Sequence, residues 1–162
     1  MFNVGVLTIS DKGYKKERED KSGKVIIQIL EDYGYVVKEY DIVPDEIDMI
    51  VEKLKYYSDD LSLDLVLTTG GTGFSKRDVT PEATEKVIEK NANGIAEAIR
   101  NFSLSITDRA MLSRAVSGIR NETLIINLPG SPKACIESLE YALDSINHGL
   151  EILTGRDFEC AR

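Results

Sequence analysis

The chain has 162 residues, of which 42% are hydrophobic and 30% charged, a composition that fits one compact domain and excludes a disordered or fibrous chain. Its 20 Lys and Arg against 28 Asp and Glu give a net charge of −8 at pH 7, which disfavours broad binding to nucleic acid or to an acidic membrane surface. A few basic side chains can still hold a small anion, because charges act within a screening length of about 10 Å. We therefore expect a single domain over residues 1–162 that binds no nucleic acid.

Cysteine usage and hydropathy bear on the cellular compartment. The two cysteines, Cys135 and Cys160, are too few for a disulfide framework and wrongly spaced for a zinc site. No basic N-terminal region precedes a long apolar stretch, and no run of about 18 apolar residues occurs. We expect a cytoplasmic protein that does not span a membrane.

The N-terminal part of the chain predicts a strand, a loop, a helix and a second strand. Val4–Ile9 is a short apolar run rich in β-branched residues, and the polar residues 10–21 after it favour a loop. Apolar residues then recur at helical spacing, with Ser22 as the expected cap and Gly34 as the expected end of the helix. The second strand is expected at about Tyr35–Val43.

The middle part predicts a helix, a strand and another helix. Pro44 opens a periodic segment that ends near Leu54, and residues 63–68 form a third apolar strand. Thr80 is the expected cap of the next helix, because a first-turn proline and a first-turn acid follow it. This helix is expected to run to about Lys90.

The C-terminal part predicts a helix over 95–102, a continuous apolar strand at Thr123–Asn127 and a long helix from Pro132 to Leu153. The alternation of apolar strands and helices predicts an α/β fold, with a mostly parallel sheet covered on both faces. Ligands in such folds lie at the carboxyl ends of the strands. The connections that gather there begin at Ser10, Val43, Thr68 and Asn127.

The densest motif is the run Thr69-Gly70-Gly71-Thr72-Gly73, which follows an apolar strand directly. Three glycines in four positions permit positive φ and let backbone N–H groups approach a ligand, and the threonines add hydroxyls. The run lacks the ending of a Walker loop and the spacing of a dinucleotide fingerprint. It predicts a cradle for an anion or a ring, although a tight turn alone would also use glycine.

Two aspartates belong to these connections. Asp45 and Asp78 follow different strands of a parallel sheet, so their carboxylates can converge. Paired carboxylates suit Mg²⁺, which binds one or two carboxylates together with substrate phosphates. The simpler alternative is that each aspartate caps a nearby helix.

Other polar side chains near the connections are weaker candidates. His148 lies within the last predicted helix, where we expect a packing or surface role, and no catalytic triad is available. Cys135 lies early in the same helix, where the helix N-terminus could lower its pKa, but burial is the more common outcome. Basic residues that could contact phosphate are Lys76, Arg77, Arg109, Arg114, Arg120 and Lys133.

The motif that joins residues 69–73 to Asp78 and continues through residues 79–84 resembles the signature of molybdenum-cofactor biosynthesis proteins. The resemblance is specifically to molybdopterin adenylyltransferases of the Mog type and to the G domain of gephyrin, and it spans nearly the whole chain. Further blocks that agree in order and spacing are Ser10-Asp11, Asp20-Lys21-Ser22-Gly23 and residues 42–46, 111–114, 118–120 and 124–131.

The resemblance implies a three-layer α/β/α domain of the MoaB/Mog type that binds molybdopterin. It implies a homotrimer that transfers AMP from ATP to the terminal phosphate of molybdopterin, releases pyrophosphate, uses Mg²⁺ and hands its product to a metal-insertion protein of the MoeA type. The implied catalytic and metal-binding residues are Asp45 and Asp78. The implied substrate-binding residues are Thr69, Gly70, Gly71, Thr72, Gly73, Ser113 and Asn127.

Two other functions fit the same family. A MoaB-like relative would bind the pterin with weak or no adenylylation, and a gephyrin-like relative would act as an oligomeric scaffold. Residues 127–132 resemble the Mog and gephyrin pattern more than the MoaB pattern, which favours the enzyme. A general flavodoxin-like nucleotide-binding module is disfavoured, because the glycine-rich loop follows the third strand and not the first.

Overall fold

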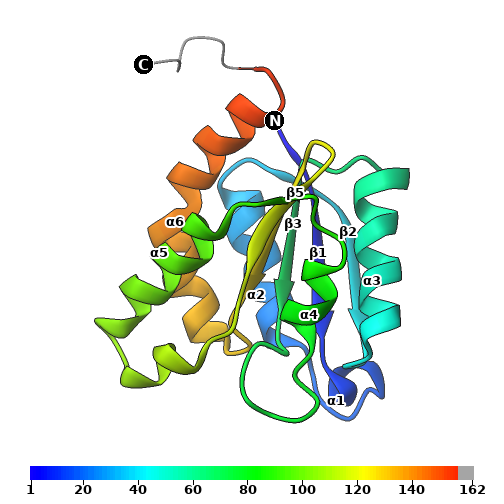
Figure 1. The fold of residues 1–162 in the computed structure, drawn as a ribbon, viewed down its shortest axis with the longest axis vertical. Coiled ribbons are helices and arrows are strands. Elements are labelled where there is room, and N and C mark those ends of the chain that lie inside the picture. The colour runs from blue at the N-terminus through cyan, green and yellow to red at the C-terminus, as the bar shows by residue number, and fades with distance from the viewer. Residues whose placement is uncertain (157–162) are drawn as a thin grey trace.

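The computed structural model describes residues 1–156, and a six-stranded sheet forms the centre of this part of the chain (Figure 1). The order of the strands is β2-β1-β3-β6-β5-β4. Neighbours among β2, β1, β3 and β6 run parallel, whereas β5 is antiparallel to both β6 and β4. The strands are β1 (Asn3–Ile9), β2 (Val36–Val43), β3 (Leu65–Thr69), β4 (Lys90–Asn91), β5 (Ser117–Arg120) and β6 (Thr123–Leu128).

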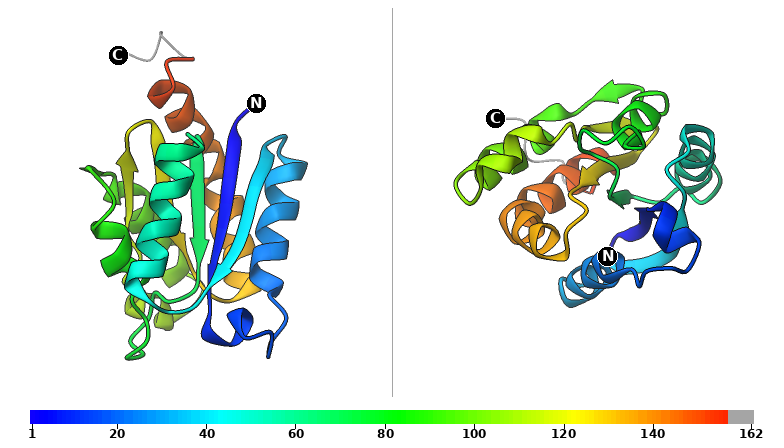
Figure 2. Two further views of the ribbon diagram at one scale, coloured as in Figure 1. Left: turned by 90° about the vertical axis from the view of Figure 1, so that its right-hand side faces the viewer. Right: turned by 90° about the horizontal axis from the view of Figure 1, so that it is seen from below.

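Helices cover both faces of the sheet, which gives the expected three layers (Figure 2, right). Helices α2, α5 and α6 pack on one face, and α3 and α4 pack on the other. The helices are α1 (Asp11–Tyr14), α2 (Lys21–Asp32), α3 (Ile47–Lys55), α4 (Thr80–Glu85), α5 (Asn93–Leu104) and α6 (Pro132–Leu153), with a π-helical turn η1 (Tyr56–Asp60) and a 3₁₀ turn η2 (Asp108–Leu112). The predicted α/β fold with a mostly parallel sheet is confirmed.

Alternating side chains of the central strands fill the two cores. Leu65 and Leu67 of β3 pack beneath α2 and α6, whereas Val66 between them faces α3 and α4. All three side chains are fully buried. A strand that is buried on both faces needs apolar residues at every position, which explains why these runs are continuous in the sequence and do not alternate.

Two helix starts differ from the prediction. Asp20, and not Ser22, caps α2, because its Oδ1 accepts the Gly23 N–H at 3.0 Å. The Ser22 hydroxyl instead donates to the carbonyl of Gly130 at 2.6 Å and ties α2 to the loop after β6. Thr80 is the first residue of α4 and not its cap, and its hydroxyl donates to the carbonyl of Gly70 at 2.9 Å.

The segment after α4 also differs. The helix ends at Glu85, and the chain then forms the short strand β4, where the prediction extended the helix to Lys90. The N–H of Glu89 donates to the carbonyl of Ile119 in β5, so pairing with a later strand overrides the local helical pattern. The short helix α1 forms within the stretch 10–21 that was predicted to be a loop.

The carboxyl ends of the parallel strands lie at the lower end of the molecule in Figure 1, together with α1 and the loop between β3 and α4. All four connections that the sequence singled out meet there, and their residues line the cavities described below. Over residues 1–156, no helix has both the length and the apolar character needed to cross a bilayer.

Candidate active site

Two adjoining cavities open at this end of the sheet. The first has a volume of about 610 Å³, and its lining includes Ser10, Asp45, Thr69 and residues 18–22. The second has a volume of about 410 Å³ and lies between the glycine-rich loop, α5, η2 and the start of α6. The residues common to both linings are Gly71, Asp78 and Gly130. Molecules bound in the two cavities would therefore meet beside Asp78.

The glycine-rich loop, residues 70–79, turns sharply as it leaves β3. Gly70 and Gly71 have φ of +95° and +69°, a region that L residues rarely adopt. A Cβ on Gly70 would lie 2.4 Å from the Ile9 carbonyl oxygen, and a Cβ on Gly71 would lie 2.3 Å from the Thr80 Oγ1. The tight-turn interpretation of these glycines is thus correct, and the same turn brings them into the cavity walls.

Asp45 and Asp78 both lie beside this turn and line the first cavity. A Cβ built on Gly71 would lie 3.2 Å from Asp45 Oδ1, and one built on Gly73 would lie 2.9 Å from Asp78 Oδ2. Burial raises the pKa of Asp45, and the negative charges of Asp11 and Asp78 raise it further, against the opposing effect of the backbone hydrogen bond from Asp11. The two carboxylates therefore share one electrostatic environment, which is the convergence that the sequence predicted.

Neither aspartate caps the helix that follows it in the chain. The residue at the N-cap of α3 is Glu46, which makes no side-chain capping bond. The Asp78 carboxylate accepts the N–H of Ser75 at 3.0 Å, within a turn that the Asp78 N–H closes on the Ser75 carbonyl. The capping alternative is therefore wrong for Asp78. The Asp45 carboxylate does bond a helix start, because it accepts the N–H of Asp11, the first residue of α1. Both aspartates line the first cavity.

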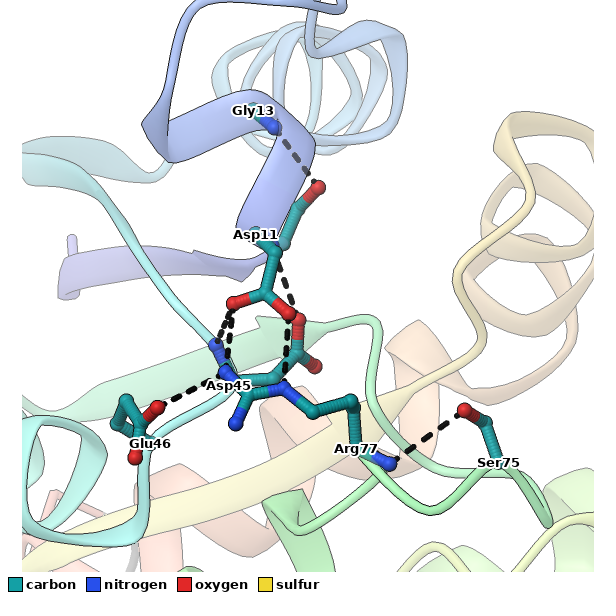
Figure 3. Close-up of polar contacts among 7 residues, drawn as sticks. Asp11, Gly13, Asp45, Glu46, Ser75 and Arg77 are labelled. Carbon is teal, nitrogen blue, oxygen red and sulfur yellow. Dashed lines mark hydrogen bonds and ion pairs between the residues drawn. The ribbon is translucent and has the colours of Figure 1, made fainter.

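Asp45 is held by a paired arrangement with Asp11 (Figure 3). The N–H of each residue donates to the carboxylate of the other, at 2.9 Å for Asp11 and 3.1 Å for Asp45. Arg77 places its guanidinium on both oxygens of Asp11 and on Glu46, at 2.9–3.0 Å. The hydrogen bonds from Arg77 lower the pKa of Asp11. Connections after β1, β2 and β3 are thereby joined around Asp45.

The other predicted site residues all lie in the walls of these cavities, but several polar side chains among them already have partners within the chain. The Thr69 hydroxyl donates to the Pro129 carbonyl at 2.6 Å. The buried Asn127 amide donates to the hydroxyls of Thr68 and Thr84, each at 3.0 Å. Thr69 and Asn127 therefore hold the framework. Ser113, Thr72 and Gly73 line the second cavity.

Most of the basic candidates have other roles. Arg77 pairs with Asp11 and Glu46, Arg120 pairs with Asp59 at the opposite end of the sheet, and Arg114 contacts the glycine-rich loop from outside the cavities. Of the six candidates, Arg109 alone lies in a cavity wall, that of the second cavity. Three basic residues that were not predicted as phosphate contacts also line the cavities: Arg18, Lys21 and Arg100. Of these, only Lys21 had a sequence signal, its place in the Asp20-Lys21-Ser22-Gly23 block.

The thiol and the imidazole take no part in the cavities. Cys135 is buried and donates to the Pro129 carbonyl at 3.0 Å, and burial raises its pKa to about 11. His148 is half exposed on α6 beside Glu151. Cys160 lies outside the described residues. Within residues 1–156, no group of three or more His, Cys, Asp or Glu side chains is placed to hold a metal.

Comparison with known proteins finds a molybdopterin adenylyltransferase, gephyrin and MoaB among the proteins that this chain is similar to. The molybdopterin adenylyltransferase of Helicobacter pylori is 46% identical over 156 residues, which cover 95% of this chain and 89% of that protein. Gephyrin of Dictyostelium discoideum is 41% identical over 94% of this chain but 23% of its own length. The crystal structure of the molybdopterin biosynthesis enzyme MoaB from Thermus thermophilus superposes with a TM-score of 0.89 at 47% identity and covers 96% of this chain and 98% of that one.

The family whose sequence profile matches this chain is described as "Probable molybdopterin binding domain", and the match runs over residues 5–148. The matched range contains every residue that the resemblance assigned to the site, from Asp45 to Asn127. The chain therefore belongs to this family of molybdopterin binding domains, as the glycine-rich loop and its aspartate predicted.

Proposed function

We propose that this chain is a molybdopterin adenylyltransferase that acts in molybdenum cofactor biosynthesis. It transfers AMP from ATP to the terminal phosphate of molybdopterin and releases pyrophosphate. The observation that carries this proposal is the pair of adjoining cavities with Gly71, Asp78 and Gly130 in common, because a two-substrate transfer needs both reactants at one junction. The identity of 46% to a protein of that name supports the same reaction.

The reaction needs positioning more than it needs a protein nucleophile. An oxygen of the molybdopterin phosphate forms a bond to the α-phosphorus of ATP, and the bond from that phosphorus to the bridging oxygen of pyrophosphate breaks. Both reactants are anions, so their approach must be held in line and their charge offset. The attacking phosphate is already ionised, and the absence of a catalytic triad from the described residues fits this chemistry.

Asp45 and Asp78 fit a magnesium site that substrate completes. They are two carboxylates close enough to interact, and the pKa of Asp45 is raised by burial and by its acidic neighbours, which a bound cation would offset. Mg²⁺ binds with one or two carboxylates plus phosphate oxygens, so two ligands from this chain suffice. When bound, Mg²⁺ supplies positive charge to the ATP phosphates. The chain's own contribution is to hold both carboxylates at the junction.

The assembly and the cellular setting are proposals that the family resemblance supports. We propose a cytoplasmic homotrimer that passes its product to a metal-insertion protein of the MoeA type. Phe74, Ile106 and Met111 are large apolar residues that are exposed by between 45% and 70%, and they supply surface that self-association would bury.

The direct test combines purified protein, molybdopterin, ATP and Mg²⁺ and measures adenylylated pterin together with pyrophosphate. We expect turnover by the wild type and a loss of about 100-fold or more in Asp78→Asn and Asp45→Asn, because each change removes charge at the junction. Asp60→Asn is the matched control, because Asp60 is an exposed aspartate after α3, at the amino end of β3. Binding of molybdopterin without AMP transfer would instead support the pterin-binding alternative, and full activity in Asp78→Asn would contradict the assignment of that carboxylate.

A further inference from the structure

Arg114 connects three points of the glycine-rich loop and the helix that follows it. Its Nε–H donates to the Gly73 carbonyl at 2.8 Å, and its Nη2–H donates to the Asp78 carbonyl at 2.8 Å. Its Nη1 pairs with the carboxylate of Glu82, in the first turn of α4. The backbone N–H of Arg114 also donates to the Thr72 carbonyl at 2.8 Å. One residue thus holds the loop on both sides of its exposed tip.

These contacts place Arg114 behind the loop and away from the reactants. Over residues 1–156, neither cavity has Arg114 in its lining, although Gly73 and Asp78 are both in the wall of the second. About one third of the side chain is exposed, and its three guanidinium nitrogens are all committed to contacts within the chain. Arg114 therefore acts on any bound molecule through the loop and not by contact.

Arg114 is the residue that joins the two sides of the loop tip. The Thr80 hydroxyl fixes the start of the loop at the Gly70 carbonyl, and Arg77 bonds to Asp11 and Glu46, but neither contact joins Gly73 to Asp78. Gly70, Gly71 and Gly73 are the residues with the greatest backbone freedom, and the tip at Phe74 is 70% exposed. Asp78 is otherwise held by its local turn with Ser75. A planar guanidinium bonded to two carbonyls and a carboxylate defines the distance between Gly73 and Asp78, which a lysine ammonium cannot do.

We propose that Arg114 is a positioning residue for AMP transfer, which sets Asp78 and the backbone of Gly73 at the junction of the two cavities. This inference rests on the proposed function and adds to it a residue that touches neither substrate. A displacement of about 1 Å at a reacting centre costs about 100-fold in rate. The loss of the Arg114 contacts should therefore appear in kcat and leave the affinity for substrates almost unchanged.

The chain offers a matched control for this residue. Arg120, like Arg114, uses all three guanidinium nitrogens on a carboxylate and on backbone carbonyl groups: two bond to the Asp59 carboxylate and one donates to the Val87 carbonyl, at the opposite end of the sheet. Arg120→Lys and Arg114→Lys therefore remove similar sets of bonds. If Arg114 is only structural, both variants should lose stability and neither should lose activity per folded molecule.

The test compares Arg114→Lys, Arg120→Lys, Asp78→Asn and the double variant of Arg114→Lys with Asp78→Asn. We expect Arg114→Lys to lower kcat by about 100-fold with KM values within about threefold of wild type, and Arg120→Lys to keep the wild-type kcat. The double variant should lose less than the product of the two single losses, because part of the effect of Arg114 acts through Asp78. The proposal would be overturned if the two losses in kcat multiply in the double variant. It would also be overturned if Arg114→Lys changes KM alone or leaves kcat unchanged.

Amide hydrogen exchange provides a readout that needs no turnover. We expect exchange over residues 73–78 to be faster in Arg114→Lys and unchanged in Arg120→Lys, because only the first change frees the loop. If the wild type shows no AMP transfer, the proposed function fails, and the exchange data still decide the role of Arg114. Equal exchange over residues 73–78 in both variants and the wild type would overturn that role.

Discussion

Alanine substitutions at Gly71 and Gly73 separate the structural role of the glycine-rich loop from its role at the junction of the cavities. Gly71 has φ of +69°, and an added Cβ would lie 2.3 Å from the Thr80 Oγ1. An L residue in this region costs about 1–2 kcal/mol. The Thr80 hydroxyl must also move and lose its bond to the Gly70 carbonyl, which costs about 1 kcal/mol. Gly71→Ala should therefore destabilise the fold by about 2–3 kcal/mol.

Gly73→Ala should behave in the opposite way. Gly73 lies outside the left-handed region, and the added Cβ meets one atom, Asp78 Oδ2, at 2.9 Å. That carboxylate is the end of a side chain at the cavity wall, so it can shift. The shift weakens its hydrogen bond from the Ser75 N–H, and stability should fall by about 1 kcal/mol or less. The shift moves a proposed magnesium ligand, and we expect kcat to fall by about 100-fold in protein that remains folded.

Thermal unfolding and AMP transfer measured on the same samples test both expectations. In a domain of this size 1 kcal/mol corresponds to about 2–4 °C, so Gly71→Ala should lower Tm by about 4–12 °C. Gly73→Ala should keep a Tm within about 4 °C of wild type while it loses activity. A wild-type Tm in Gly71→Ala would refute the argument from its backbone, and wild-type turnover in Gly73→Ala would refute the contact with Asp78.

Three further outcomes are expected. The pKa of Asp45 is raised in the folded protein, so the ionisation of this carboxyl lowers the stability of the fold as the pH rises above 3.8, the ordinary pKa of an aspartate. Asp45→Asn should therefore raise Tm at pH 7 in the absence of ligand but not near pH 4. A lower Tm at pH 7 would contradict this. Cys135 should resist a thiol reagent at pH 8 until denaturant is added, as followed by mass spectrometry of its peptide, because burial raises its pKa to about 11; rapid labelling of the folded protein would show that it is accessible. Light scattering should give three times the chain mass of 18.0 kDa, and a monomer at micromolar concentration would exclude the trimer.

The parts of the fold that the sequence predicted well are those governed by local pattern. Residues 65–69 and 123–128 form buried strands because continuous apolar runs suit a sheet covered on both faces. Helix α6 forms over Pro132–Leu153 with the expected proline in its first turn. Because the strands are parallel, the connections that follow them lie at the same end of the sheet. The proximity of Asp45 and Asp78 therefore follows from the topology and not from any local motif.

The parts that the sequence did not predict depend on contacts between distant residues. Val87 and Ile88 suit a helix or a strand equally, and the pairing of Glu89 with Ile119 in β5 decides the outcome. Distant contacts also decide the roles of Arg77 and Arg114. In the sequence each is an isolated basic residue of the kind that binds a phosphate. Their carboxylate and carbonyl partners, 66 and 41 positions away in the chain, show that they hold the loop instead.

The distribution of charge around Asp45 explains why these two arginines are not available to phosphate. Asp11, Asp45 and Asp78 bring three carboxylates together in a chain whose net charge is −8, and such a group would repel an anionic substrate. Arg77 offsets Asp11 with a two-pronged contact, which leaves the charge of Asp45 and Asp78 for the magnesium ion that we propose. Arg114 adds its positive charge behind the loop, where it holds Asp78 without competing for that cation. The site thus keeps its negative charge at the junction where we propose that a magnesium ion and two phosphates meet.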